Sequence, residues 1–218
     1  MLFLILSEHS PLDNWALKIY IGSCILNPME FTKEGIILKR ELSELDRFTL
    51  HFIKILRKHS PYALVSGYVS ILLGRSRASE DVDVLTPRMP PDKFQMLVED
   101  LRKHNFTCLN TGSVDEMHEY LTEGVPLRFM EHGKTIPNME LKWAKSTIDE
   151  LTLKKAITVF LEKEELKISP LEMQIAFKEK ILKSQKDLED AQHLRMVAEG
   201  HLNKEGIKAY GMMLDEFY

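Results

Sequence analysis

The chain has 218 residues, of which 44% are hydrophobic and 28% are charged, and its formal net charge is -4. This composition excludes a wholly disordered chain, and the small net charge excludes nucleic-acid binding through an overall basic surface. The length is sufficient for one substantial core, with or without a helical appendage.

The sequence shows no sign of export or membrane insertion. Its start, MLFLILSEHS, is apolar but lacks the basic residues and the small-residue cleavage site of a signal peptide. No apolar run approaches the roughly 20 residues that a membrane-spanning helix needs. Cys24 and Cys108 have neither metal-type spacing nor partners for a disulfide framework, so we expect a cytoplasmic protein with reduced cysteines.

The pattern of elements divides the chain into three parts. Residues 1–28 are an N-terminal extension to which we assign no function, residues 29–168 mix helices and strands, and residues 169–218 are helical. No repeat, low-complexity tract or long flexible linker separates these parts. The order predicts an α+β fold with a mixed β-sheet packed on helices and a C-terminal helical region that packs on this core.

In the first half of the core, helical and extended patterns alternate. We expect a helix over 42–59, a strand over 62–65, a short helix over 68–73 and a strand over 81–85. Apolar residues in the first helix recur at three- and four-residue steps, and Ser60-Pro61 ends it. The segment DVDVL (81–85) alternates with period two, as a half-buried strand does.

The second half of the core is followed by helices. We expect a helix from Pro90 to about Lys103, strands at 105–109 and 125–130, a helical piece between those two strands, and a hairpin of 155–161 with 166–168. Helices should then begin at Ser169-Pro170-Leu171-Glu172, near Ser184 and near Asn203, and the first of these starts combines an N-cap, a proline and a glutamate at favoured positions.

The segment SGYVSILLGRSRASEDVDV (66–84) carries the candidate chemistry. Asp81 and Asp83 are two residues apart on a predicted strand, so their carboxylates emerge on the same face, where a hard cation such as Mg²⁺ would relieve their repulsion. Ser66-Gly67 ends one strand and opens a helix, and such a turn lets backbone N–H groups approach a phosphate. Arg75 and Arg77 could neutralise further phosphate charge.

This segment resembles the signature of the minimal nucleotidyltransferases of the DNA polymerase β superfamily, in particular the AbiEii-like group. In that pattern a Gly-Gly or Gly-Ser turn and a short helix precede Gly-x-x-Arg-x-Ser/Thr-x-Asp-x-Asp. Gly67 matches the second glycine, and the later positions are matched by Gly74, Arg77, Ser79, Asp81 and Asp83. Ser66 stands where a first glycine is commoner. The likeness spans roughly 36–200 and implies a nucleotidyltransferase-type sheet.

The resemblance also implies roles for residues outside this segment. In the stretch 168–194, Lys178 would contact the triphosphate, and Asp187 would support metal binding or remove a proton from the acceptor. A third carboxylate normally comes from a neighbouring strand, and Glu131, at the end of VPLRFMEHG, is the only acid there. Asp81 and Asp83 would hold Mg²⁺, with two ions in all, while Ser66, Gly67, Arg77 and Ser79 would bind the nucleotide.

The implied function is transfer of a nucleoside monophosphate from an NTP to a hydroxyl of RNA, a protein or a small molecule, with a toxin or antitoxin as a possible partner. Two other functions stay open: a catalytically degraded relative that binds a nucleotide or a partner, and a protein-binding module of a toxin–antitoxin pair. No membrane partner is expected.

Several of the candidate residues also have a purely structural explanation. A bare Asp-x-Asp is typical of a solvated strand edge, and Arg75 of an ordinary surface arginine. Ser184-Gln185-Lys186-Asp187 is typical of a capping box, and Lys178, near Lys180 and Lys183, of a solvated basic helix face. Glu131 can simply end its strand.

Overall fold

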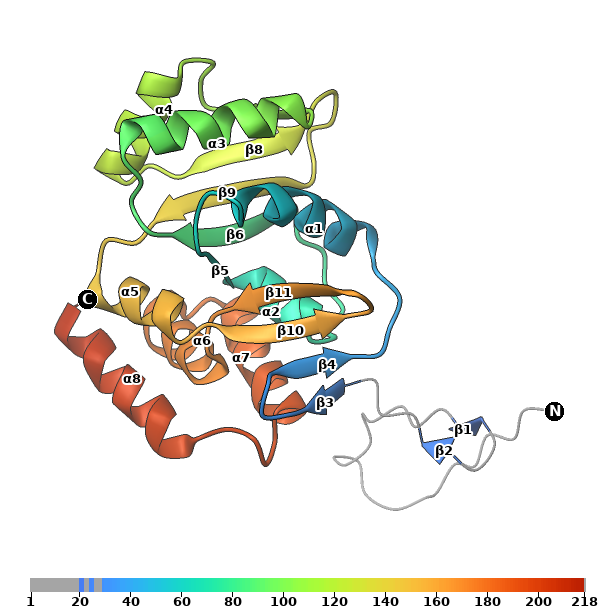
Figure 1. Cartoon of the computed structure of the whole chain (residues 1–218). Coiled ribbons are helices and arrows are strands. Elements are labelled where there is room, and N and C mark those ends of the chain that lie inside the picture. Colours follow the sequence, from blue (N-terminus) through green and yellow to red (C-terminus); the bar gives the residue numbers. More distant parts are fainter. Residues whose placement is uncertain (1–19, 22–23, 26–28, 218) are drawn as a thin grey trace.

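The computed structural model describes residues 20–21, 24–25 and 29–217. Within them, nine strands form one mixed sheet in the order β3-β4-β10-β11-β5-β6-β9-β8-β7, and the short strands β1 and β2 pair separately. Helices α1 and α3 lie across the half of the sheet formed by β6, β9 and β8, while the C-terminal helices gather at the other half (Figure 1). The prediction for 1–28 falls largely outside the described residues.

The bounds of the elements are as follows. The strands are β1 Tyr20–Ile21, β2 Cys24–Ile25, β3 Met29–Phe31, β4 Ile36–Leu38, β5 Ala63–Val65, β6 Asp81–Thr86, β7 Phe106–Cys108, β8 Leu127–Glu131, β9 Asn138–Trp143, β10 Ile157–Leu161 and β11 Glu164–Ile168. The helices are α1 Glu44–Leu56, α2 Gly67–Leu72, α3 Pro91–Lys103, α4 Val114–Glu123, α5 Thr147–Lys154, α6 Leu171–Phe177, the π-helical turn η1 Lys178–Leu182, α7 Gln185–Val197 and α8 Lys204–Phe217.

The predicted α+β class, with a mixed sheet packed on helices and C-terminal helices, is confirmed. The predicted hairpin is β10 paired antiparallel with β11. The sequence analysis did not predict β3, β4, α5 and β9. Of these, β9 matters most for function, because it pairs in parallel with β6, the strand that carries the aspartate pair.

Around β6, β9 and β8 the two faces of the sheet differ in character. Successive side chains of a strand point to opposite faces, so register decides which residues share a face. One face carries buried apolar side chains and packs against α1 and α3; for example, the rings of Phe52 and Phe129 lie 5.7 Å apart and those of Phe94 and Trp143 5.8 Å apart. The other face carries the polar side chains of these strands.

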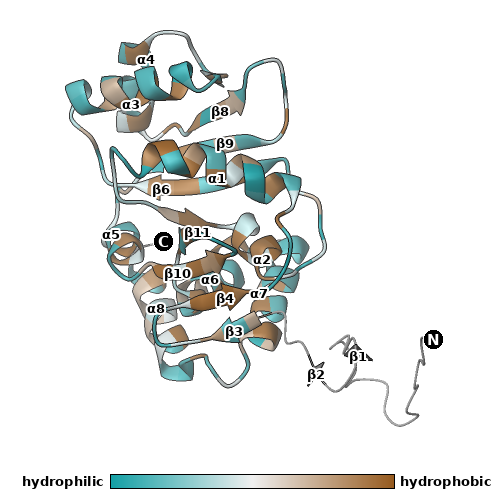
Figure 2. Cartoon of the chain, turned by 45° about the vertical axis from the view of Figure 1, so that its right-hand side comes forward, coloured by the Kyte–Doolittle hydropathy of each residue, from teal (hydrophilic) through white to brown (hydrophobic). Residues whose placement is uncertain are grey.

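Burial of apolar side chains follows from this layering. The central strands and the inward faces of the helices are mostly brown in Figure 2, which marks hydrophobic residues, while the outer faces of the helices are teal. Among the described residues, none of the helices combines the length and the apolar character needed to cross a membrane.

Asp46 is a buried hub that ties α1 to α2. Its side chain is 0% exposed and accepts hydrogen bonds from Arg40 at 2.6 and 3.1 Å, from the hydroxyl of Tyr68 at 2.7 Å and from the backbone N–H of Ser43 at 2.8 Å. Burial by itself would raise the pKa of Asp46, but the hydrogen bonds from Arg40, Ser43 and Tyr68 lower it below its usual range. The carboxylate therefore fixes the N-terminal part of α2, which starts at Gly67.

We expect Asp46→Asn to lower the free energy of unfolding by about 2 kcal/mol at pH 7, because Arg40 loses its charged partner. A carboxyl whose folded-state pKa is lowered stabilises the fold at neutral pH, and this contribution is lost as the pH falls below about 4. The gap between wild type and variant should therefore narrow in acid. Urea unfolding at pH 7 and at about pH 2, well below the unfolded-state pKa of an aspartate, measures this gap, with exposed Glu44→Gln as the control; an equal gap at both pH values would contradict this role.

Candidate active site

The turn between β5 and α2 lies beside the aspartate pair. Ser66 has a φ of 61°, in the left-handed region that residues other than glycine rarely adopt. At Gly67 a Cβ atom would lie 1.9 Å from Nη2 of Arg77, so a larger residue here would displace this guanidinium from its observed position. Val65, the last residue of β5, is the register partner of Asp83. The structure thus brings the predicted turn, arginine and aspartate together.

Glu140 of β9 supplies a third carboxylate beside Asp81 and Asp83. It is the register partner of Asp83 on the neighbouring parallel strand, so its side chain emerges on the same face of the sheet. Its side chain is only 12% exposed. Sequence reasoning missed Glu140 because it missed β9, although the alternation in NMELKW (138–143) is the period-two signal of a strand.

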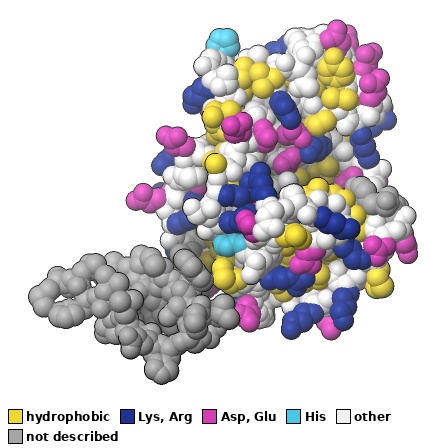
Figure 3. Space-filling model, turned by 180° about the vertical axis from the view of Figure 1, so that it is seen from behind, with side chains coloured by type: hydrophobic (Ala, Val, Ile, Leu, Met, Phe, Trp, Pro, Cys, Tyr) yellow, Lys and Arg dark blue, Asp and Glu magenta, His cyan; other side chains and the backbone are white. Residues whose placement is uncertain are grey.

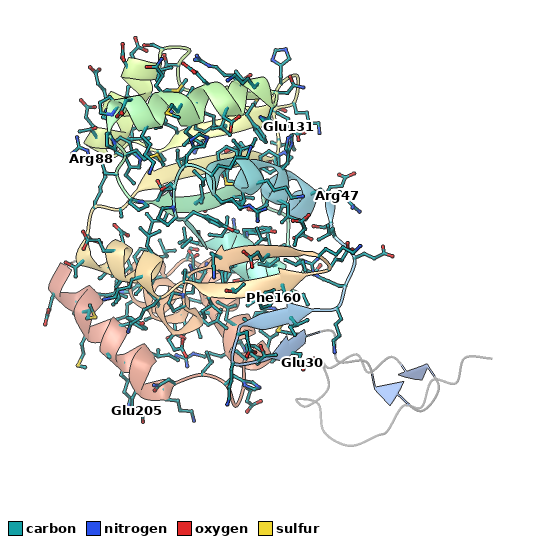
Figure 4. All side chains as sticks on the ribbon, in the orientation of Figure 1. Glu30, Arg47, Arg88, Glu131, Phe160 and Glu205 are labelled. Atoms are coloured by element: carbon teal, nitrogen blue, oxygen red, sulfur yellow. The ribbon has the colours of Figure 1, made fainter. Side chains whose placement is uncertain are left out.

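The structure places Glu131 on the opposite face from the aspartate pair. It has the same parity in β8 as buried Phe129, whereas Arg128, the partner of Glu140, points to the polar face. Glu131 contacts Nδ1 of His51 at 3.0 Å and accepts from Nζ of Lys134 at 2.6 Å. Figure 4 labels it at the end of β8, near the helices that cover this face. Glu131 is therefore not brought to the pair, and Glu140 stands there instead.

Basic side chains and one amide group donate hydrogen bonds to the three carboxylates. Asn138 Nδ2 donates to Asp81 at 2.6 Å, and Nζ of Lys142 donates to Asp83 at 2.7 Å and lies 2.8 Å from Oε1 of Glu140. Nε of Arg128 donates to Glu140 at 3.2 Å. Burial would raise the pKa of Glu140, but Lys142 and Arg128 lower it, so this side chain is a carboxylate at neutral pH. The back of the molecule shows basic and acidic side chains interleaved at its centre (Figure 3).

A second cluster joins the loop before β6 to the C-terminal helices through Asp190 of α7, which is 0% exposed. Asp190 accepts from Nε and Nη2 of Arg77 at 3.1 and 3.2 Å, from Nζ of Lys178 at 2.8 Å, and from Arg75. Lys178 is itself 1% exposed and also donates to Asp187 at 3.1 Å. Sequence reasoning found Arg77, Lys178 and Asp187 but not Asp190, whose isolated place in a helix pattern gave no signal.

The negative charge of Asp83 affects the pKa values of the cations in this second cluster. Burial lowers the pKa of Lys178, while Asp187 and, more weakly, Asp83 raise it. Burial also lowers the pKa of Arg77, Arg75 lowers it further, and Asp187 and Asp83 oppose this. The carboxylates on the sheet and the cations held by Asp190 are therefore neighbouring halves of one charged region.

Two predicted residues also have the structural roles that the sequence left open. Asp187 lies in the first turn of α7, where its backbone N–H donates to Oγ of the N-cap residue Ser184 at 3.2 Å, and its side chain binds Lys178 as well. The hydroxyl of Ser79 donates to the backbone carbonyl of Asp81 at 3.0 Å, which orients the start of β6 rather than pointing to a ligand. Lys178 is buried, so the interpretation of a solvated basic face does not apply to it.

The polar face offers hard oxygen donors, which suit a divalent cation such as Mg²⁺. As the described side chains are placed, no group of three or more His, Cys, Asp or Glu residues converges closely enough to hold an ion. The ammonium of Lys142 lies between Asp83 and Glu140 and contacts both. By donor chemistry the residues fit such an ion, and Asp81, Asp83 and Glu140 are those that would hold it.

No protein-family model and no curated protein matches the chain. Several solved structures show a distant likeness. A nucleotidyltransferase-like antigenic protein from Paracoccidioides brasiliensis has a TM-score of 0.48 and 14% identity over 81% of this chain and 90% of that chain, and the antibiotic-resistance factor ANT(2'')-Ia has a TM-score of 0.48 and 12% identity over 81% of this chain and 95% of that chain. The lincomycin-bound lincosamide antibiotic adenylyltransferase LnuA has a TM-score of 0.44 and 14% identity over 72% of this chain and 99% of that chain. Because these TM-scores are below 0.5, the likeness does not establish a function, and the function is inferred below from this chain's own residues.

We expect Asp190→Asn to lower the free energy of unfolding by about 3 kcal/mol, because Arg77 and Lys178 would keep their charges with no buried counterion. Neighbouring Glu189→Gln is the matched control: its exposed carboxylate contacts Arg75 at 2.5 Å and should contribute less than about 1 kcal/mol. Urea unfolding measures both variants. Equal losses in the two would show that Asp190 is no more than a surface ion-pair partner.

Proposed function

We propose that this chain is a metal-dependent nucleotidyltransferase that moves a nucleoside monophosphate from an NTP to a hydroxyl group. The observation that carries the proposal is the alignment of Asp81, Asp83 and Glu140 on one face of β6 and β9, next to the Ser66-Gly67 turn. Two carboxylates are common on solvated strands, but a third from an adjacent strand, beside a turn strained at Ser66, is the arrangement that a divalent cation and a phosphate need.

The strain at Ser66 and the close approach at Gly67 support a functional turn. A left-handed φ at a residue other than glycine costs free energy, and such costs concentrate at functional sites. Arg77 closes over Gly67 so tightly that a methyl group would not fit. Arg77 and Lys178 add positive charge near the carboxylates, although both are buried against Asp190, and positive charge near this turn favours the phosphates of a nucleotide.

In the proposed reaction, the acceptor hydroxyl oxygen attacks the α-phosphorus of the NTP. A new P–O bond forms, the bond from the α-phosphorus to the bridging oxygen breaks, and pyrophosphate leaves with that electron pair. The proton of the hydroxyl passes to a carboxylate on the same face, and Glu140 and Asp83 are the candidates for this role. Bound divalent ions, held by the three carboxylates, would neutralise charge on the attacking and leaving oxygens.

The remaining residues position the substrate in this scheme. Arg77 and Lys178 lie on the α2–β6 loop and η1, where their charges face the carboxylates, and they are the candidates for binding the triphosphate. Asp187 orients Lys178. Acceptor classes are RNA, a protein or a small molecule; a toxin or antitoxin partner and a cytoplasmic location remain predictions from the sequence.

A second candidate is a nucleotide-binding module without efficient transfer. The observation that favours it is that all three carboxylates already have protein donors in Asn138, Lys142 and Arg128. Such a module would gain thermal stability from an NTP with Mg²⁺ but would release no pyrophosphate with any acceptor.

The test is a transfer assay with each of the four α-³²P-labelled NTPs and Mg²⁺, using RNA, protein and small hydroxyl acceptors in parallel. We expect labelled acceptor and released pyrophosphate from the wild type. Glu140→Gln and Asp83→Asn should each lower the rate by roughly 100-fold or more, because each removes charge that stabilises the transferring phosphoryl group.

Glu131→Gln is the matched control for this assay, since Glu131 lies on the opposite face of the same sheet. It should leave the transfer rate unchanged. Loss of activity in Glu131→Gln but not in Glu140→Gln would reverse the assignment of the third carboxylate. Stabilisation by NTP without transfer to any acceptor would favour the binding module.

A further inference from the structure

Lys142 has an unusual place in the candidate site. It follows Glu140 by two residues in β9, so both side chains emerge on the polar face. Its Nζ lies 2.7 Å from Oδ1 of Asp83 and 2.8 Å from Oε1 of Glu140, the two carboxylates that are paired in register. One ammonium group therefore bridges the two acids that a shared cation would bridge.

An ammonium group between these two carboxylates disfavours a metal ion at the same place. A lysine ammonium only donates hydrogen bonds, so it cannot coordinate a metal, and its positive charge repels a divalent ion nearby. Burial would lower the pKa of Lys142, but Asp83 and Glu140 raise it above its usual value, so the group stays charged at neutral pH. Lys142 and an ion thus compete for the same pair of carboxylates.

The surroundings of Lys142 allow its side chain to move away from the two carboxylates. Its side chain is 39% exposed, against 15% for Asp83 and 12% for Glu140, so it can leave without unfolding of the strand. A cavity of about 180 Å³ borders it, lined among others by Leu85, Val125 and Trp143. The carboxylates are held by the sheet, while the lysine is the movable member of the bridge.

We propose that Lys142 is a built-in competitor for the metal of this site: its ammonium group occupies the shared position between Asp83 and Glu140, and a divalent ion binds there only by displacing it. This inference rests on the proposed function. The phosphates of an NTP offer the displaced ammonium a new partner, so metal and nucleotide should favour each other's binding. Lys142 would then keep the site closed to free metal ions in the absence of nucleotide.

The test measures Mn²⁺ binding to the intact protein without nucleotide, from the electron paramagnetic resonance signal of free Mn²⁺. Lys142→Met should bind Mn²⁺ roughly tenfold or more tightly than the wild type, because one competing charge is removed. Lys142→Gln, which keeps hydrogen-bond donors but lacks the charge, should shift the affinity in the same direction. Both variants are checked for folding by circular dichroism.

Lys145→Met is the matched control, because Lys145 is an exposed lysine just beyond the end of β9 that donates to the carbonyl of Glu123 rather than to the three acids. Its Mn²⁺ affinity should equal that of the wild type. Adding Asp83→Asn to Lys142→Met should abolish the gain, which places the ion at this site.

An unchanged Mn²⁺ affinity in both Lys142 variants would overturn the inference. So would a gain that survives Asp83→Asn, because the ion would then bind elsewhere. Neither outcome depends on transfer activity, so failure here is distinguishable from failure of the proposed function, which shows as absence of transfer by the wild type.

Discussion

The carboxylate of Asp190 is the only negative group in contact with both Arg77 and Lys178 among the described residues, and the arrangement of the site depends on it. Two largely buried cations are costly unless a counterion shares their environment. Because Asp190 is on α7, Arg77 on the loop before β6 and Lys178 on η1, this one charge joins the C-terminal helices to the sheet. It also sets how closely Arg77 approaches Gly67.

The charged region is therefore assembled from two structural layers. The sheet contributes Asp81, Asp83 and Glu140, with positions set by strand register, while the loop before β6 and η1 contribute Arg77 and Lys178, with positions set by ion pairs. Register is rigid, since hydrogen bonds on both sides hold β6 and β9. Ion pairs with long side chains can exchange partners. This division suits a site in which fixed acids would hold an ion and basic side chains would adapt to the phosphates of a substrate.

Local patterns were sufficient to predict much of the fold, and they predicted that the turn and the carboxylate pair belong to one site. The spacing of glycine, arginine and two aspartates in 66–84 predicted a turn and a carboxylate pair that the structure brings together. Lys178 and Asp187 do meet, although their pairing follows from the π-helical turn and the packing of α7, which no local pattern shows. The predicted roles of these residues await experiment.

The rest could not be predicted, for two physical reasons. Glu140 was missed because NMELKW was not recognised as a strand. Glu131 was chosen as the only acid in VPLRFMEHG, without knowledge of the face on which it emerges. Asp190 was missed because its importance arises only from long-range contacts with the loop before β6. A residue's chemistry is visible in sequence, but the face on which it emerges is a tertiary property.

The alternation of side chains along β9 limits which insertions and deletions the strand can accept. Asn138, Glu140 and Lys142 reach the polar face only because each is separated from the next by one buried residue, Met139 or Leu141. Inserting or deleting a single residue in this strand would turn Glu140 and Lys142 into the apolar layer and bring Leu141 out to water. A change of length in β9 should therefore be tolerated far less than a change of length in the connecting loops.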